Sequence, residues 1–479
     1  MVRSPPAPAP PAAPTMGYYV PLQPPVAGTV EDGEELGGST RAINAYMSCN
    51  YGRGEGSSDG PEFDPFYKLW LYKEEEIFKD ITCCAVAFRL LRIKGFEVSS
   101  DFLVPYAERD HISLQTTSVS TILELYRASQ IRIHEDETNL DAINEWTTTF
   151  LKQQLLSETI PDKKLQEKVE YELKNFHGIL GRIGNRRSLD LYDVENYHVM
   201  KAAYRCPTIY NEEFLIYSRQ DFNICQALHQ KEFQRLERWY SDCGLDRLNF
   251  GRDALRMAHF MASAIFGDRQ LVDARMSFAK NVVLIARIDD FFDQHGSREE
   301  SYKILDLVKE WNEKPTVEYG FQEVEILFTA VYRTVNELAE MAYVAQGRCV
   351  KHHLISLWVE ILTSFVKEFD TWCEDDAINL DKEKEERRVN AVSILKESDD
   401  ENEEMAVSKI EKLIEYNRRK LLRMVYKRET IVPRKCKDLF SEICKMGYYL
   451  YSSSGGDEFT SPQQIMEDVK SLIHQPLYS

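Results

Sequence analysis

The sequence predicts an all-helical protein with at least two globular units. Glycine contributes only 22 of 479 residues, which is below its usual share of about 7%. Long stretches are rich in Leu, Glu, Lys, Arg and Ala, and they lack the alternation of apolar and polar residues that marks strands. A chain of 479 residues also exceeds the usual limit of a single hydrophobic core. We therefore expect helices throughout, divided between two or more domains.

Composition and charge argue against several classes of protein. The net charge is −19 and the isoelectric point is near 5.1, so no basic stripe is available to displace counterions from a nucleic acid. No run of about 18 apolar residues occurs, so we expect no transmembrane segment. The ten cysteines show neither CxxC pairs nor zinc-ligand spacing, which indicates a reducing compartment; disulfides are the alternative, because the count is even. The oligomeric state does not follow from the sequence.

Residues 1–62 form a tail rich in Pro, Ala and Gly, which opens with SPPAPAPPAAP. Such a composition cannot bury a core, so we expect this tail to be disordered. Its first 30 residues contain no acid, as in a plastid transit peptide, but they hold only Arg3 as a basic residue and little Ser. The targeting signal is therefore weak.

The helices divide into two predicted units, residues 63–209 and 210–479. In the first unit an apolar stripe ends at Gly95, and helices follow at 117–130 and 139–156. The stripe consists of Ile77, Ile81, Ala85, Phe88 and Leu91. Helices of the second unit are expected at 212–239, 251–266, 271–294, 299–312, 320–346, 349–373, 404–427, 433–452 and 461–474.

The most informative feature is Asp289-Asp290-Phe291-Phe292-Asp293, at the end of a run from Met276 to Ile288 that is apolar on nearly every face. We expect that helix to be largely buried. Asp289 and Asp293 are four residues apart and share a helix face, so their carboxylates point toward the apolar wall. Two such ligands suit Mg²⁺, which fills its octahedron with phosphate oxygens. The alternative is an acidic helix end that faces water.

A second set of oxygen ligands follows at helical spacing, formed by Asp375, Asn379 and Glu383. If this row faced the first one, the two rows would bracket Mg²⁺ ions, and the ions would bracket a diphosphate. Acidic residues are dense between positions 374 and 404, so a solvated helix face is the competing interpretation.

Arg252 and several aromatic residues are further candidates for the same chemistry. Arg252 precedes Asp289 by 37 residues on the preceding predicted helix and can form bidentate hydrogen bonds to a diphosphate; an ordinary surface ion pair is the alternative. Ring faces stabilise cations, although most aromatic residues at helical spacing belong to a core. The aromatic candidates are Phe291, Phe292, Trp358, Trp372, Tyr448 and Tyr449.

These residues together resemble the class I plant terpene synthases, and specifically the kaurene synthase-like diterpene synthases. The similarity runs from about residue 65 to 477 with one gap. Its blocks include DITCCAVAFRLLRIKGFEVSSD (80–101), ELYRASQIRIHEDE (124–137), NRRSLDLYDVENYHVMKAAYRC (185–206), LVDARMSFAKN (271–281), IVPRKCKDLF (431–440) and DEFTSPQQIMEDVKSLIHQPL (457–477). The resemblance implies a partial helical β domain at 63–209 and a class I α domain at 210–479, with an internal deletion before residue 375.

The resemblance also implies roles for the site residues. Asp289 and Asp293 fall on magnesium ligands, and Asp375, Asn379 and Glu383 fall on the second metal motif. Catalytic roles fall on Arg252, on Asp290 as the second aspartate of the first motif, and on Lys382 just before the motif's Glu. The implied cofactor is Mg²⁺, as three ions, with Mn²⁺ as an alternative.

The implied reaction is metal-assisted loss of diphosphate followed by cyclisation of the allyl cation. No DxDD motif occurs, so the expected substrate is an already bicyclic copalyl diphosphate, the ent isomer, and the expected product is an ent-kaurene-like diterpene of gibberellin or phytoalexin metabolism. The resemblance favours the plastid, with the cytoplasm as the alternative because the transit signal is weak.

Three departures from the family pattern weaken this transfer. Asp293 and Asp375 are separated by 82 residues, which is short by roughly three helices at about 15 to 20 residues each. Trp372 replaces an arginine, and Arg287 stands at an apolar position of the pattern. The alternative function is therefore a shortened, catalytically impaired helical protein. A prenyl-chain elongase is less favoured, because it would carry two DDxxD motifs.

Overall fold

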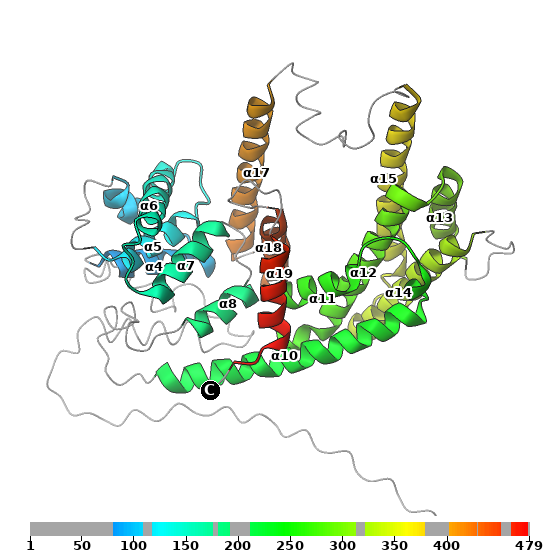
Figure 1. Cartoon of the computed structure of the whole chain (residues 1–479), viewed down its shortest axis with the longest axis horizontal. Coiled ribbons are helices and arrows are strands. Elements are labelled where there is room, and N and C mark those ends of the chain that lie inside the picture. The colour runs from blue at the N-terminus through cyan, green and yellow to red at the C-terminus, as the bar shows by residue number, and fades with distance from the viewer. Residues whose placement is uncertain are drawn as a thin grey trace, which may run out of the picture. The chain divides into compact units, whose positions relative to one another are not determined.

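The computed structural model describes residues 80–108, 117–175, 181–191, 211–312, 321–378, 402–428, 430–451 and 461–477. Side chains are not described at 211–214, 371–378, 403 and 462. Within these ranges every regular element is a helix, as Figure 1 shows, so the predicted all-α class is confirmed. The predicted tail at 1–62 lies outside the described residues. No helix in the described ranges has the length and apolar character needed to cross a bilayer.

The first group of helices surrounds one hydrophobic core. It consists of α4 (Ile81–Ile93), α5 (Val119–Ser129), α6 (Thr138–Leu156) and α7 (Lys163–Lys174). Helix α4 begins at Asp80, whose carboxylate accepts hydrogen bonds from the backbone N–H groups of Thr82 and Cys83 at 2.8 and 3.2 Å. It ends before Gly95, whose φ of +84° favours glycine. Within the predicted stripe Ala85, Phe88 and Leu91 are fully buried.

Two helices were not predicted, α7 and α8 (Gly181–Asp190). Both have few apolar residues, so the sequence pattern gives a weak signal. Tertiary contacts stabilise them instead. Val169 of α7 belongs to the first core, and the buried Arg186 of α8 donates to the carbonyl groups of Ser471 and Gln475 near the C-terminus.

The second group of helices is centred on α12 (Val272–Asp290). Helix α12 contacts α10 (Asn211–Asp242), α11 (Ala254–Ile265) and α14 (Gln322–Gln346). Helix α13 (Arg298–Glu310) in turn packs against α14 and α15 (Lys351–Ile378). The fully buried side chains of Val283, Leu284 and Ile288 place the inner face of α12 in this core. None of the residues 276–288 is exposed, so the prediction that the helix before the DDFFD motif is largely buried is confirmed.

The last helices are α17 (Glu403–Tyr426), α18 (Arg434–Tyr451) and α19 (Pro462–Val469), which continues into a π-helical turn, Lys470–His474. This turn and the segment after it are bound to α10 by side-chain amides. Asn223 and the backbone of Leu477 exchange two hydrogen bonds of 2.9 and 2.8 Å, and Gln230 donates to the carbonyl of Ile473. The C-terminal segment and α10 thus form one packed unit.

Candidate active site

The DDFFD motif begins on the last turn of α12 and continues into a π-helical turn, Phe291–His295. The N–H of Gly296 closes this turn by donating to the carbonyl of Phe291 at 2.6 Å. A π turn contains more residues than an α turn, and such turns are frequent at functional sites. The motif therefore does not continue the row of α12 side chains that a regular α-helix would produce.

The three carboxylates of the motif differ in exposure. The side chain of Asp290 is 6% exposed, that of Asp289 is 34% exposed, and Asp293 is exposed. Asp289 is half-buried, like Ile285 on the helix face that the two were predicted to share, whereas Asp293 is exposed and is not set against the apolar wall as predicted. Ile288, Phe291 and Phe292 face the core at this end of α12, and Asp290 faces the neighbouring segment before α11, where it finds hydrogen-bond donors.

Arg252 contacts two of these carboxylates, Asp289 and Asp290. Its backbone N–H donates to Oδ2 of Asp290 at 2.9 Å, and its Nε lies 3.1 Å from Oδ1 of Asp290. A terminal nitrogen of Arg252 pairs with Asp289. The side chain of Arg252 is 60% exposed, so its guanidinium group lies at the surface. Its backbone is bound by the buried carboxylate of Asp290. The structure thus brings together Arg252, Asp289 and Asp290.

Arg252 is not part of a helix, contrary to the prediction of a helix at 251–266. Helix α11 begins at Ala254. Gly251 has a φ of +81°, a left-handed conformation that interrupts helical geometry. A Cβ at this position would lie 2.6 Å from Oδ2 of Asp290 and 2.9 Å from Nη1 of Arg287. Gly251 therefore allows the close approach that places Arg252 beside α12.

The carboxylates at the end of α12 fit a divalent cation as one half of a ligand set. Asp289 and Asp293 offer hard oxygen atoms at the surface, which is the donor type that Mg²⁺ prefers. Among the described residues no group of three potential ligands of the His, Cys, Asp or Glu type comes together. Asp289 is paired with Arg252, so a cation and this guanidinium would share or compete for the same carboxylate.

The second predicted ligand row lies mostly beyond the described residues. Asp375 is placed on the last turns of α15, but only its backbone is described. Asn379, Lys382 and Glu383 lie outside the described ranges. Their predicted roles stay predictions.

The aromatic candidates are mostly core residues. Phe291, Phe292 and Trp358 are buried within the core around α12, and Tyr449 is buried in a different cluster with its hydroxyl donating to Asp468. The core alternative is thus the correct one for these four. Tyr448 is partly buried, and the side chain of Trp372 is not described.

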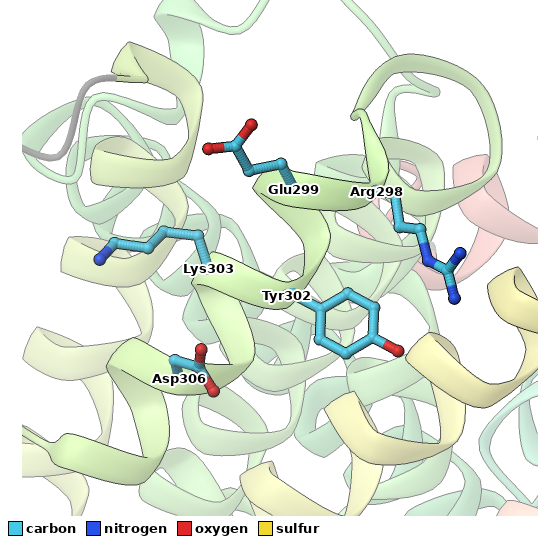
Figure 2. Close-up of a pocket in the computed structure, with 5 residues that line it drawn as sticks. All are labelled: Arg298, Glu299, Tyr302, Lys303 and Asp306. Atoms are coloured by element: carbon cyan, nitrogen blue, oxygen red, sulfur yellow. The ribbon is translucent and has the colours of Figure 1, made fainter.

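Sequence reasoning missed a polar link between α13 and α15. The hydroxyl of Tyr302 donates to Oδ2 of Asp370 at 2.5 Å, and Arg298 lies 2.9 Å from Oδ1 of the same carboxylate. Figure 2 shows Arg298 and Tyr302 on α13 beside a shallow hollow that is also lined by Glu299, Lys303 and Asp306. Asp370 lies five residues before Asp375 on α15, so this link joins α13, the helix that follows the DDFFD motif, to the helix that carries Asp375. No sequence signal distinguishes these residues from other surface polar groups.

The sequence also gave no hint of the role of Phe250. Its ring stacks on His295 with centroids 4.3 Å apart and lies 5.7 Å from the ring of Phe291. These contacts join the segment before Arg252 to the π turn. The fold and this cluster together define an all-helical protein whose candidate site lies where the carboxylate-rich end of α12 meets an arginine from the neighbouring loop.

The chain belongs to the terpene synthase family. The family's metal binding domain matches residues 241–380, and its N-terminal domain matches residues 63–173. The first match includes Arg252, the DDFFD motif, Asp375 and Asn379, and it ends before Lys382 and Glu383. The metal binding domain supports the expectation of a divalent cation, typically Mg²⁺.

Similar proteins are plant diterpene synthases. A chloroplastic class I diterpene synthase of Vitex agnus-castus is 52% identical over 86% of this chain and 79% of its own length. A chloroplastic miltiradiene synthase of Isodon rubescens is 53% identical over 86% of this chain and 76% of its own length. These relatives support the predictions of a class I diterpene synthase, which is a lyase acting on a prenyl diphosphate, and of a plastid location.

Solved structures confirm the fold. The isoprene synthase of grey poplar, solved in complex with three Mg²⁺ ions and dimethylallyl-S-thiolodiphosphate, superposes with a TM-score of 0.71 at 21% identity. The superposition covers 92% of this chain and 91% of that one. The predicted terpene synthase fold is therefore correct.

Proposed function

We propose that this protein is a class I diterpene synthase that acts on a copalyl diphosphate. The protein would ionise the substrate, release diphosphate and cyclise the remaining cation to a hydrocarbon or a tertiary alcohol. The observation that carries this proposal is the contact of Arg252 with Asp289 and Asp290 at the end of α12, inside the matched metal binding domain.

Each described residue of the cluster has a distinct task in this proposal. Asp289 at the end of α12 and Asp293 in the π turn would hold Mg²⁺. Asp290 is buried and holds Arg252 by two contacts, so that the guanidinium group is aimed before substrate arrives. Arg252 then exchanges its carboxylate partner for the phosphate oxygens of the leaving group. Bound Mg²⁺ would act as a Lewis acid that neutralises the charge of the departing diphosphate.

The finer assignments rest on the family resemblance. Asp375, Asn379 and Glu383 complete the ligand set, for three ions in all, and Lys382 assists the diphosphate; Mn²⁺ is an alternative cation. The proposed substrate is the ent isomer of copalyl diphosphate and the product an ent-kaurene-like diterpene. The domain boundaries 63–209 and 210–479 are likewise proposed. Because a relative is named a miltiradiene synthase, the assay compares the copalyl diphosphate isomers and looks for products other than an ent-kaurene-like diterpene.

The test is incubation of the purified full chain with Mg²⁺ and each copalyl diphosphate isomer, followed by gas chromatography with mass spectrometry. We expect a diterpene product, its loss in Asp289→Ala, and its retention in Asp273→Asn, an exposed aspartate in the first turn of the same helix. Absence of product from every isomer at every Mg²⁺ concentration would favour the alternative, a shortened family member without synthase activity. The 82-residue interval between Asp293 and Asp375 is the observation that favours this alternative.

A further inference from the structure

Arg287 is a buried cation that the proposed reaction does not use. It lies two residues before Asp289, and its side chain is buried. A buried arginine requires hydrogen-bond acceptors, because removing its charge from water is costly. The acceptors of Arg287 therefore indicate what this residue does.

The guanidinium group of Arg287 binds backbone carbonyl groups of a single segment. Nη1 donates to the carbonyl of Phe250, and Nη2 lies 3.2 Å from the carbonyl of Leu248 and 3.4 Å from that of Leu245. All three carbonyls belong to the connection between α10 and α11, and this connection also carries Arg252. Arg287 thus binds the connection between α10 and α11 to α12.

Two aromatic rings also lie near the guanidinium group of Arg287. Its central carbon lies 5.7 Å from the ring centre of Phe250 and 5.9 Å from that of Tyr240 on α10. The ring of Phe250 also stacks on His295 of the π turn. Arg287 therefore binds the carbonyl group of Phe250, while His295 contacts its ring.

Arg287 and Asp290 bind the connection on either side of Gly251. They are three residues apart, so they lie on neighbouring positions of one helix face. Arg287 holds the carbonyl of Phe250, Asp290 holds the backbone N–H of Arg252, and Gly251 lies between them with no room for a side chain. Two fixed points on either side of one glycine leave the backbone at Arg252 little freedom.

We propose that Arg287 is a positioning residue, which sets the orientation of Arg252 toward a bound diphosphate by anchoring the connection between α10 and α11. It need not touch the substrate. The diphosphate part of this inference rests on the proposed function, whereas the anchoring part does not. A group that acts only through Arg252 loses its effect when Arg252 is removed, and that property distinguishes positioning from a general contribution of charge.

The test is a double-mutant cycle with Arg287→Met, Arg252→Ala and the double variant. Mg²⁺-dependent binding of inorganic diphosphate is measured by isothermal titration calorimetry. We expect Arg287→Met to weaken binding about tenfold, which is the effect of about one hydrogen bond to a charged group. In the Arg252→Ala background the same change should alter binding less than about twofold. A tenfold loss in both backgrounds, or none in either, would overturn the positioning role.

Hydrogen exchange of residues 245–253, followed by mass spectrometry without metal or ligand, tests the anchoring independently. Arg287→Met should exchange faster in this peptide than the wild-type chain, and unchanged exchange would overturn the inference even if diphosphate binds. If the wild-type chain binds no diphosphate while exchange responds as expected, the proposed function fails and the anchoring stands.

Two further variants serve as controls. Arg287→Lys keeps the charge, so it provides an intermediate effect should Arg287→Met fail to fold. Arg333→Met removes another arginine that donates to a backbone carbonyl, that of Asp242 at 2.8 Å, from an exposed position on α14. It should leave both diphosphate binding and exchange of 245–253 unchanged.

Discussion

Replacement of Asp290 by asparagine is the most direct test of the arrangement around Arg252. The carboxylate accepts the backbone N–H of Arg252 at 2.9 Å and faces its Nε at 3.1 Å. An asparagine has one acceptor oxygen and one donor group, so it can satisfy only one of these two nitrogen atoms. The other nitrogen would meet an N–H group, and the buried site would also lose its negative charge.

The size of the effect follows from the burial of each partner. A buried donor left without an acceptor costs about 1–3 kcal/mol. The Nε contact contributes less, at most about 1 kcal/mol, because the side chain of Arg252 is 60% exposed and water screens it. We therefore expect Asp290→Asn to lower the free energy of unfolding by about 2 kcal/mol. Product formation should fall at least about tenfold, because Arg252 is no longer aimed.

Urea unfolding followed by circular dichroism measures the first effect, and product analysis at saturating Mg²⁺ measures the second. Asp273→Asn is the matched control, since it makes the same chemical change at an exposed position on the same helix and should stay within about 0.5 kcal/mol of the wild-type protein. An Asp290→Asn variant as stable and as active as this control would refute our account of the cluster.

Three further outcomes are expected. Arg275→Met should lower the free energy of unfolding by about 3–5 kcal/mol, because buried Glu232 then lacks its ion-pair partner. In the folded chain Nε and Nη2 of Arg275 each lie 2.9 Å from an oxygen of Glu232. An unchanged midpoint in urea unfolding would contradict this. Burial lowers the pKa of His229 to about 3 and the pKa of His259 to about 4, whereas the pKa of an exposed histidine is 6.5. Below pH 6.5 the folded state therefore binds fewer protons than the unfolded state. Stability should therefore be fully present above pH 6.5 and decline toward pH 4 by about 1.4 kcal/mol per pH unit for each histidine, and His259→Gln should show a shallower slope between pH 7 and 5. Removal of divalent cations with a chelator should abolish product formation, and Mg²⁺ should restore it; turnover that persists in the chelator would exclude the proposed ligand role of Asp289.

Much of the fold was predictable because its signals are local. Apolar periodicity and the stop at Gly95 defined α4, and the same period placed most helices of the second group within a few residues of their observed bounds. The weakly apolar α7 and α8 escaped prediction, since their stability comes from contacts with distant parts of the chain.

The candidate site was only partly predictable. The DDFFD motif lies at a helix end, as predicted, and Arg252, which the sequence analysis grouped with it, contacts Asp289 and Asp290. A regular α-helix was assumed through the motif, so the π turn and the inward direction of Asp290 were not foreseen. Arg287, which looked like a departure from the family pattern, is explained only when the carbonyl groups around it are known.

The sequence by itself determined the helical class, the family and the residue types that carry the chemistry, because composition, period and motif spacing are properties of neighbouring residues. Tertiary structure decided which carboxylate is buried, where helix α11 begins and what holds Arg252. Those features depend on hydrogen bonds between groups 37 to 42 residues apart in the sequence, such as the one from Arg287 to the carbonyl of Leu245. A buried polar group cannot bind water, so its partners are those that the fold places beside it.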